Sequence, residues 1–210
     1  MKLYTAMLSP FAARCRMQIY AKGLEVDFIE AGSGFAKEEL AEISPIAKMP
    51  VLDDNGLIIP ESEVICEYLE DRFPENSLRP VDADSRAMVR LLSRIADTYV
   101  FASLFPLFAH LSRKRRDPEV VTAKLAELNK GLASIEYFLG DGDYAVGDSL
   151  TLADCCLVPI LLFVSHYLTF FDISDAFENF PKISAYFERM SQQAIPARAI
   201  EEIRAAMAAL

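Results

Sequence analysis

Apolar and polar positions recur at two different spacings in the first third of the chain, and these spacings predict short strands and short helices. A helix is predicted over residues 10–22, whose apolar positions fall on one side. Gly23 ends it, because glycine readily takes up the left-handed backbone of a helix C-terminus. The same reading gives strands over residues 2–6, 26–30, 51–53 and 57–59, and helices over residues 36–43 and 62–72.

The order of these elements predicts a particular sheet. A strand, a helix and a second strand imply a parallel pair joined by a right-handed crossover. Asn55-Gly56, between two apolar runs, is a strong hairpin signal and adds two antiparallel strands. The sequence therefore predicts a thioredoxin-like α/β domain over residues 1–76.

Residues 74–84 are polar and rich in turn residues, which is typical of a linker. Beyond them the apolar spacing is helical throughout, with a bend expected at Pro106 in the first helix. The sequence predicts an all-α helical domain over residues 85–210. Its expected helices cover residues 85–112, 119–139, 151–167, 181–193 and 196–209.

Composition and charge limit the classes of function. The chain has 210 residues, is 52% hydrophobic and carries a formal net charge of -10. Such a charge repels phosphate backbones, so no nucleic-acid partner is expected. The N-terminus lacks the layout of a signal peptide, and the longest apolar stretch is about half a membrane span. We therefore expect a cytoplasmic protein with no membrane partner.

The cysteines form no CxxC pair and have no histidine at metal-ligand spacing, so no metal site is expected. Each lies in an apolar, helical stretch, which is typical of reduced, buried thiols in a cytosolic protein. They are Cys15, Cys66, Cys155 and Cys156.

Two short stretches have both a structural and a functional interpretation. Ser9-Pro10 suits a helix cap followed by the first helical residue. A hydroxyl at a helix start can also donate a hydrogen bond to a thiolate and so lower the pKa of the thiol. Met49-Pro50 suits either an ordinary trans proline that opens a strand or a cis bond that turns the Met49 backbone toward an extended peptide.

A third stretch, Glu61-Ser62, precedes the helix over residues 62–72. Ser62 suits an N-cap and Glu61 a solvated acid, but the same helix start would attract a carboxylate and Glu61 an ammonium group. Taken functionally, the three stretches describe one ligand with a free α-amino acid end, a peptide-like middle and a thiol. Glutathione has these three parts.

These motifs resemble the cytosolic glutathione transferases over essentially the full length of the chain. SPFAARCR is similar to the active-site loop of the tau and omega classes, SPIAKMPVL to the segment around the family's cis-proline, and ESEVICEYLEDRFP to its glutamate–serine helix. SLTLADCCLVP resembles the capping box of the central helix of the second domain, with Thr151 and Asp154 as partners. FPKISAYFERM resembles a later helix. The resemblance implies the glutathione transferase fold.

The resemblance also implies roles for the residues of a glutathione site. Ser9 would be catalytic and would hydrogen-bond the glutathione sulfur. The backbone of Met49, next to Pro50, would pair with the cysteinyl unit. Glu61 and Ser62 would bind the γ-glutamyl end.

The other end of glutathione and the second substrate have further candidates. Lys48 would approach the glycyl carboxylate, and Lys37 is a second candidate for that end. Phe11, Tyr99 and Phe105 would contribute to a pocket for a hydrophobic electrophile, although each of them also suits plain core packing.

Ser9 stands where omega-like members of the family carry a cysteine that forms mixed disulfides. Serine cannot form one, so we expect conjugation, in which the glutathione thiolate attacks an electrophilic carbon. Glutathione would be a co-substrate, with no further cofactor, and the protein would be a homodimer like most of the family. Two alternatives stay open: a glutathione-dependent isomerase of a small unsaturated acid, and a non-catalytic interaction protein of the stringent-starvation type on the same fold.

Overall fold

The computed structural model describes residues 1–30 and 37–209 and divides into two compact units. Unit 1 comprises Met1–Arg79 and Gln193–Leu210, and unit 2 comprises Pro80–Gln192. Both units have fully buried apolar side chains of their own. Each unit therefore has a hydrophobic core of its own.

Unit 1 contains a sheet formed by β1 (Lys2–Thr5), β2 (Asp27–Glu30), β3 (Val51–Asp54) and β4 (Leu57–Pro60). The strand order is β2-β1-β3-β4, with β1 parallel to β2 and β3 antiparallel to both β1 and β4. Asn55 and Gly56 form the hairpin turn with φ angles of 54° and 94°, the left-handed backbone that such turns require. The predicted parallel pair and hairpin are confirmed.

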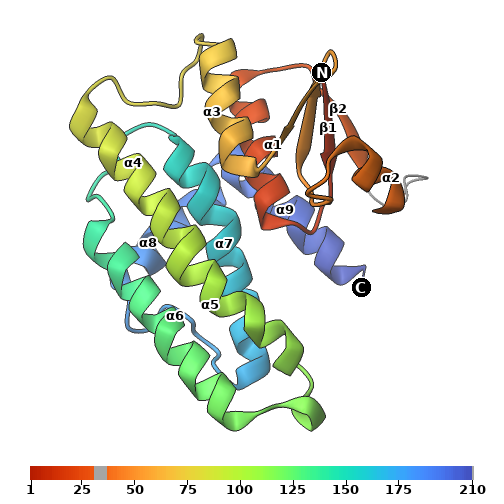
Figure 1. Ribbon diagram of the computed structural model, residues 1–210. Helices are drawn as coiled ribbons and strands as arrows, with labels where there is room; N and C mark the ends of the chain where they lie inside the picture. Colours follow the sequence, from red (N-terminus) through yellow and green to blue (C-terminus); the bar gives the residue numbers. More distant parts are fainter. Residues whose placement is uncertain (31–36, 210) are drawn as a thin grey trace. The chain divides into compact units, whose positions relative to one another are not determined.

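Three helices accompany this sheet, namely α1 (Pro10–Lys22), α2 (Lys37–Ile43) and α3 (Ser62–Arg72). α1 and α3 lie together on one side of the sheet, and α2 lies on the other side (Figure 1). α1 has the predicted bounds, and Gly23 closes it with a φ of 65°. This is the predicted thioredoxin-like arrangement.

A buried polar network joins α1 to α3. Lys22 Nζ donates to Glu70 Oε1 at 3.1 Å, and Gln18 Nε2 donates to the same oxygen at 2.9 Å. The other carboxylate oxygen of Glu70 accepts from the backbone N–H of Leu78 at 3.0 Å. Because a buried charge is tolerated only when it is paired and hydrogen-bonded, the network fixes the two helices together and holds the chain that leaves α3.

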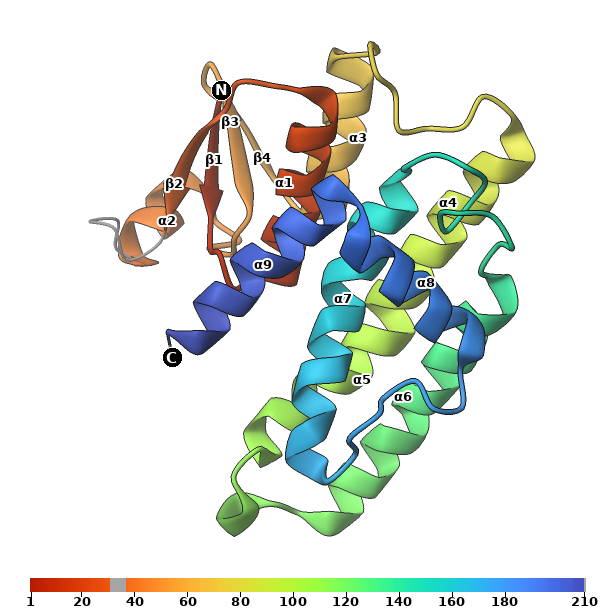
Figure 2. The same ribbon diagram turned by 180° about the vertical axis from the view of Figure 1, so that it is seen from behind.

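The last helix, α9 (Ala194–Ala208), packs against α1 (Figure 2), so the end of the chain belongs to unit 1. Its inner face buries Ala199, Ile200 and Ile203. The domain predicted over residues 85–210 placed this helix with the helical unit instead. Apolar spacing identifies the face of a helix that is buried, but it does not identify the surface that covers this face.

Unit 2 contains α4 (Ala83–Ile95), α5 (Ala102–Leu104), α6 (Pro118–Phe138), α7 (Leu152–Leu168) and α8 (Pro181–Gln192), with 3₁₀ turns at Arg113–Arg115 and Thr169–Phe171. The helix predicted over residues 85–112 is less regular than expected. It passes through a π-helical segment at Ala96–Phe101 and ends in a 3₁₀ segment at Phe105–His110. At Gly131 of α6 a Cβ would lie 2.8 Å from the carbonyl oxygen of Tyr99, so this glycine permits α6 to approach the π-helical segment closely.

α7 is a core helix of unit 2, with most of its residues buried. It begins with the predicted capping box, in which Thr151 and Asp154 satisfy each other's backbone N–H groups. Residues 83–110 and 152–171 have the length and hydropathy of membrane spans, but 78% of the apolar window in residues 152–171 is buried within the protein. Such burial is typical of the core helix of a globular protein.

Candidate functional site

Two of the three candidate stretches, Met49-Pro50 and Glu61-Ser62, line one cavity in unit 1 together with Phe11, which follows the third stretch, Ser9-Pro10. Its volume is about 180 Å³. It lies among the first turn of α1, the loop before β3 and the start of α3. The described residues that line it are Phe11, Lys48, Met49, Pro50, Glu61 and Ser62. The fold thus brings together residues that are distant in the sequence.

The Met49–Pro50 peptide bond is cis, which is the second of the two predicted alternatives. Pro50 is buried directly before β3, and Met49 is half-buried at the cavity. Proline donates no N–H group, so it can occupy the entry of a strand without leaving a donor unpaired. Met49 therefore borders the cavity at the position from which its backbone is predicted to pair with a peptide.

The start of α3 differs by one residue from the prediction. Ser62 is the first helical residue, and Glu61 takes the cap position with a φ of 71°. A left-handed φ is uncommon for a residue other than glycine and is often found at functional sites. The side chain of Glu61 makes no capping hydrogen bond to this helix, and the acidic residue of its first turn is Glu63.

Two side chains of opposite charge border the cavity. Lys48 is exposed on the loop before Pro50, and Glu61 is exposed at the start of α3. A ligand with a carboxylate at one end and an ammonium group at the other would meet a complementary charge at each end. This arrangement suits an amino acid or a short peptide.

Ser9 caps α1, as predicted. Its Oγ accepts a hydrogen bond from the backbone N–H of Ala12 at 3.3 Å, and its own N–H donates to the carbonyl of Ala6 at 2.9 Å. Among the described lining residues this stretch is represented by Phe11 and not by the half-buried Ser9. Because Oγ is the acceptor toward Ala12, the hydroxyl proton can still be donated elsewhere.

Three further predicted residues are not among the described residues that line this cavity. Lys37 is the first residue of α2, and its side chain is outside the described part of the structure. Tyr99 and Phe105 belong to unit 2, where both are exposed. A shared pocket of Phe11, Tyr99 and Phe105 for an electrophile stays a prediction.

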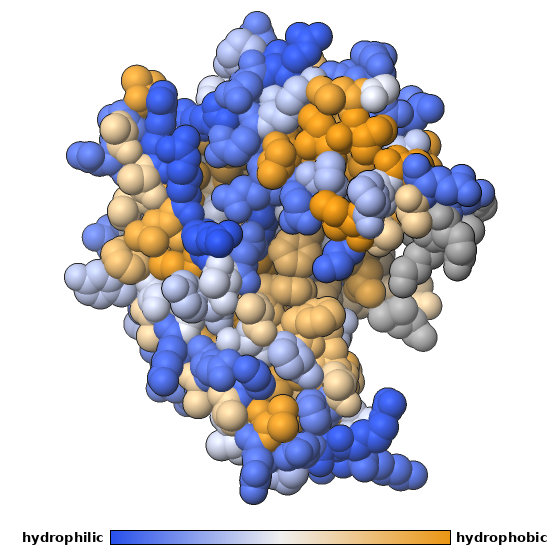
Figure 3. Space-filling model, viewed as in Figure 1, coloured by the Kyte–Doolittle hydropathy of each residue, from blue (hydrophilic) through white to orange (hydrophobic). Residues whose placement is uncertain are grey.

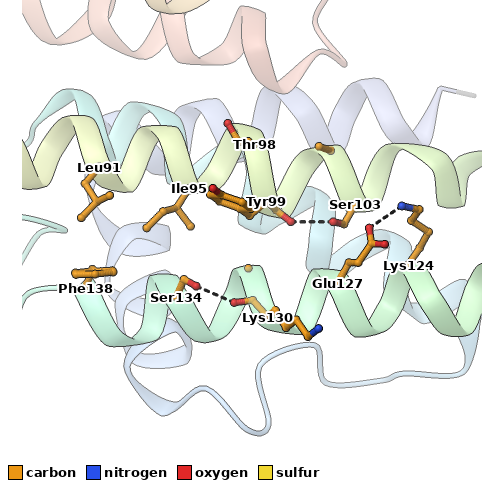
Figure 4. Close-up of a pocket in the computed structure, with 12 residues that line it drawn as sticks. Leu91, Ile95, Thr98, Tyr99, Ser103, Lys124, Glu127, Lys130, Ser134 and Phe138 are labelled. Atoms are coloured by element: carbon orange, nitrogen blue, oxygen red, sulfur yellow. Dashed lines mark hydrogen bonds and ion pairs between the residues drawn. The ribbon is translucent and has the colours of Figure 1, made fainter.

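Tyr99 lines a larger cavity of about 750 Å³ within unit 2, between the α4–α5 run and α6. In Figure 4, Leu91 and Tyr99 face this cavity from one side and Phe138 from the other. Lys124 and Glu127 form an ion pair of 2.6 Å at its edge. Figure 3 shows apolar surface in separate areas among polar side chains, one of them over α4. The spacing of apolar residues could not reveal this cavity, because it arises from the packing of two helices.

Phe105 belongs to an aromatic cluster. Its ring centroid lies 6.0 Å from that of Phe101 and 5.7 Å from that of Phe108. Tyr167 of α7 was not predicted from the sequence, and its ring centroid lies 4.5 Å from that of Phe108. Burial raises the pKa of the Tyr167 hydroxyl. The signal that could have found Tyr167 is its helical spacing of four residues from Phe163.

The four cysteines are free and buried, which confirms the prediction of buried thiols. Cys15 Sγ lies 3.6 Å from the carbonyl oxygen of Ser62 and so connects α1 to the start of α3. Within residues 1–30 and 37–209, no group of three or more His, Cys, Asp or Glu side chains could hold a metal ion.

The sequence matches two family models in order along the chain. Residues 3–77 match the model described as "Glutathione S-transferase, N-terminal domain", and residues 95–194 match "Glutathione S-transferase, C-terminal domain". The first match includes every described residue that lines the small cavity of unit 1.

Individual proteins are similar over about three quarters of their length. The chain is 32% identical to Glutathione S-transferase 1 of Dianthus caryophyllus, over 77% of this chain and 76% of that protein. It is 30% identical to the stringent starvation protein A homolog of Coxiella burnetii, over 79% and 77% of the two chains. It is also 30% identical to maleylacetoacetate isomerase of Rattus norvegicus, over 75% and 74%.

A solved structure agrees with these matches. The crystal structure of a glutathione S-transferase from Methylobacterium radiotolerans, in complex with glutathione sulfonate, has a TM-score of 0.78 and 25% sequence identity. The likeness covers 95% of this chain and 93% of that chain. On the evidence of both family models and of these relatives, the chain belongs to the glutathione S-transferase family.

Proposed function

We propose that this protein is a glutathione transferase in which Ser9 stabilises the glutathione thiolate for attack on an electrophilic small molecule. The observation that carries the proposal is the cavity of unit 1, in which Met49-Pro50, Glu61-Ser62 and Phe11, two residues after Ser9, come together. A protein that uses the fold only as a scaffold has no need to retain these residues together. Their convergence favours an enzyme over an interaction protein.

Each part of glutathione has a proposed partner at this cavity. Glu61 would bind the γ-glutamyl ammonium group, and Ser62 with the start of α3 would bind the neighbouring carboxylate. The Met49 backbone, next to Pro50, would pair with the cysteinyl unit. Lys48 would attract the glycyl carboxylate. The two charged side chains are exposed, so a ligand can reach them from solvent.

The proposed chemistry begins with the thiol. A hydrogen bond donated by the Ser9 hydroxyl, together with the partial positive charge at the start of α1, favours the thiolate and lowers the pKa of the bound thiol. The sulfur electron pair then forms a bond to an electrophilic carbon, and a leaving group departs with its bonding pair or, in an addition, the product takes up a proton. Serine forms no mixed disulfide, so thiol–disulfide exchange is not part of the proposal.

For the second substrate we propose a hydrophobic electrophile that contacts Phe11, Tyr99 and Phe105. Phe11 borders the cavity of unit 1, and the side chains of Tyr99 and Phe105 are 57% and 62% exposed. The family resemblance also supports a homodimer in the cytoplasm, which sedimentation analysis and cell fractionation would test.

An isomerase is the second candidate, favoured by the 30% identity to maleylacetoacetate isomerase. It would use the same thiolate, but its acidic substrate would need additional cations. Turnover of a maleyl-type acid, assayed beside a chlorinated nitroaromatic, separates the two enzymes. The similarity to a stringent starvation protein A homolog leaves an interaction protein as the third candidate, and failure of the protein to bind immobilised glutathione would favour it.

The sharpest test of the proposal is Ser9→Ala. We expect kcat to fall by about 100-fold, because removing one hydrogen-bond donor from a developing or stabilised anion typically has an effect of this size. The dissociation constant of glutathione, measured by calorimetry, should change by less than about threefold, because Glu61, Ser62 and Lys48 remain. Ser9→Thr keeps the hydroxyl and is the matched control. An equal loss of turnover and affinity in Ser9→Ala would contradict the proposed role.

A further inference from the structure

We propose that Glu202, on the C-terminal helix α9, is a positioning residue that holds the Ser9 loop through the buried side chain of Arg16. This inference rests on the proposed function, because it concerns the residue that would contact the glutathione sulfur. Every residue involved belongs to unit 1. α9 and α1 lie side by side in Figures 1 and 2.

Arg16 is fully buried, and its guanidinium is directed at the chain just before Ser9. Nη1 donates to Thr5 Oγ1 at 3.0 Å and to the Ala6 carbonyl at 3.3 Å. Nη2 donates to the Met7 carbonyl at 3.1 Å. One rigid, planar group therefore binds three consecutive residues at the end of β1.

The loop that Arg16 holds determines where Ser9 lies. The Ala6 carbonyl accepts from Arg16 and also from the Ser9 N–H at 2.9 Å. Ser9 Oγ in turn accepts from the N–H of Ala12 in the first turn of α1. A displacement of the Ala6 carbonyl would therefore move both the Ser9 backbone and its hydroxyl.

Glu202 provides the counter-charge for Arg16. Its Oε2 accepts from Arg16 Nε at 2.9 Å, while Oε1 accepts from the Tyr20 hydroxyl at 2.8 Å and from Arg198 Nε at 3.1 Å. The side chain of Glu202 is 20% exposed and that of Arg16 is not exposed at all. A buried guanidinium without a partner is strongly unfavourable, so the carboxylate fixes both the charge and the orientation of Arg16.

Tyr20 and Arg198 hold the carboxylate itself. The guanidinium carbon of Arg198 lies 3.6 Å from the centroid of the Tyr20 ring, and both side chains bind the same oxygen of Glu202. Because the carboxylate is fixed by two groups besides Arg16, it acts as a rigid support. The end of the chain thus supports the geometry of a residue near its beginning.

The matched pair of variants is Glu202→Gln and Glu201→Gln. Both remove one carboxylate charge from neighbouring positions of α9, but Glu201 is exposed. Hydrogen exchange of the Ser9 and Ala12 amides, measured without glutathione, reports the loop directly. We expect exchange at least tenfold faster in Glu202→Gln, as when a buried charged partner is lost, and wild-type rates in Glu201→Gln.

A second measurement follows the thiol of bound glutathione. In a pH titration, the ultraviolet absorbance of the bound thiolate should appear at a pH about one unit higher in Glu202→Gln than in the wild type. This shift corresponds to a roughly tenfold lower ratio of thiolate to thiol at a given pH. At neutral pH kcat should fall by about the same factor, while the KM for glutathione stays within about twofold.

The outcomes separate the two proposals. Exchange rates at Ser9 and Ala12 that match those of Glu201→Gln overturn the positioning role, and so does an equal acceleration across all of unit 1, which would show a purely structural role. If the wild type binds no glutathione, the proposed function fails, and the exchange rates still decide the role of Glu202. If Glu202→Gln does not fold, Tyr20→Phe removes one hydrogen bond to the same carboxylate and should accelerate the same two amides to a smaller degree.

Discussion

Two helix starts in this protein are built in different ways, one in each unit. At the start of α7, the carboxylate of Asp154 accepts four hydrogen bonds. Two come from Thr151, from its N–H at 2.7 Å and its hydroxyl at 2.9 Å. The other two come from the Ala145 N–H at 2.8 Å and the Tyr186 hydroxyl at 2.9 Å. Both Thr151 and Asp154 are buried. This helix start has no access to a ligand.

The start of α1 has no such carboxylate. Its first turn holds no acidic residue, and its cap is the single, longer hydrogen bond between Ser9 Oγ and the Ala12 N–H. The start of α7 is neutralised by its own buried acid, whereas the start of α1, with no acid in its first turn, retains a partial positive charge for an external anion. The sequence marks both starts with a hydroxyl residue, so the position of the acid distinguishes their roles.

The largest expected effect is on the closed start. Asp154→Ala would leave the buried donors of Thr151, Ala145 and Tyr186 without their acceptor, at a cost of about 1 kcal/mol or more for each. Because four donors lose their acceptor, we expect the free energy of unfolding in urea to fall by about 4 kcal/mol or more. Thr151→Ser, which keeps the box, should change it by less than about 1 kcal/mol. A loss in Asp154→Ala as small as that of the control would show that the box does not stabilise α7.

Ser9→Asp converts the open start into one capped by a carboxylate. Aspartate is as good an N-cap as serine, so the free energy of unfolding should change by less than about 1 kcal/mol. The added negative charge would oppose a thiolate at the same place, and we expect turnover to fall by more than about 100-fold. Steady-state kinetics and urea unfolding of the same preparation measure both. Retained turnover would mean that the sulfur is bound elsewhere.

A smaller effect is expected at the start of α3. Glu61→Gln removes the carboxylate proposed to bind the glutathione ammonium group, and the dissociation constant should rise by about tenfold, which corresponds to about 1.4 kcal/mol. Glu61 is exposed, so stability should not change. Glu25→Gln, also exposed in unit 1, is the control. Calorimetry that finds the same affinity in both variants would remove Glu61 from the site.

The smallest expected effect is on the pH dependence of stability, through Tyr20 between α1 and α9. Burial and the hydrogen bond to Glu202 raise the pKa of Tyr20 to about 12 from an ordinary value of 10.0. The folded protein therefore keeps this proton at pH values at which the unfolded chain loses it, so the contribution of Tyr20 to stability is present below pH 10 and is lost as the pH rises toward about 12. In Tyr20→Phe, the free energy of unfolding should fall less steeply between pH 10 and about pH 12. An unchanged slope in the variant would show that Tyr20 does not couple to folding.

Local sequence signals predicted most of the fold and most of the candidate site. Helix bounds such as Pro10–Lys22 follow from apolar spacing and from cap residues within a few positions. The hairpin at Asn55-Gly56 follows from the backbone freedom of two residues. The residues of the proposed glutathione site were predicted from motifs, and five of them, Lys48, Met49, Pro50, Glu61 and Ser62, line one cavity.

Other features escaped prediction because they depend on contacts between distant segments. Arg16 is polar, so its spacing suggests a surface position, yet it is buried beneath α9. Glu202 is separated from Arg16 by 186 positions, so no local pattern joins them. The π-helical segment at Ala96–Phe101 packs against α6, where Gly131 permits close approach. This contact also joins segments that are distant in the sequence.

By itself, the sequence determined the order of strands and helices, the capped helix starts and the motifs that identify the family, because these are set by a few neighbouring residues. The tertiary structure alone decided that α9 belongs with α1 and which charged side chains are buried, and it selected the cis form from the two that were predicted for the Met49–Pro50 bond. The physical reason is that the burial of a charge and the convergence of a site depend on which surfaces the folded chain brings together, and local spacing carries no information about that choice.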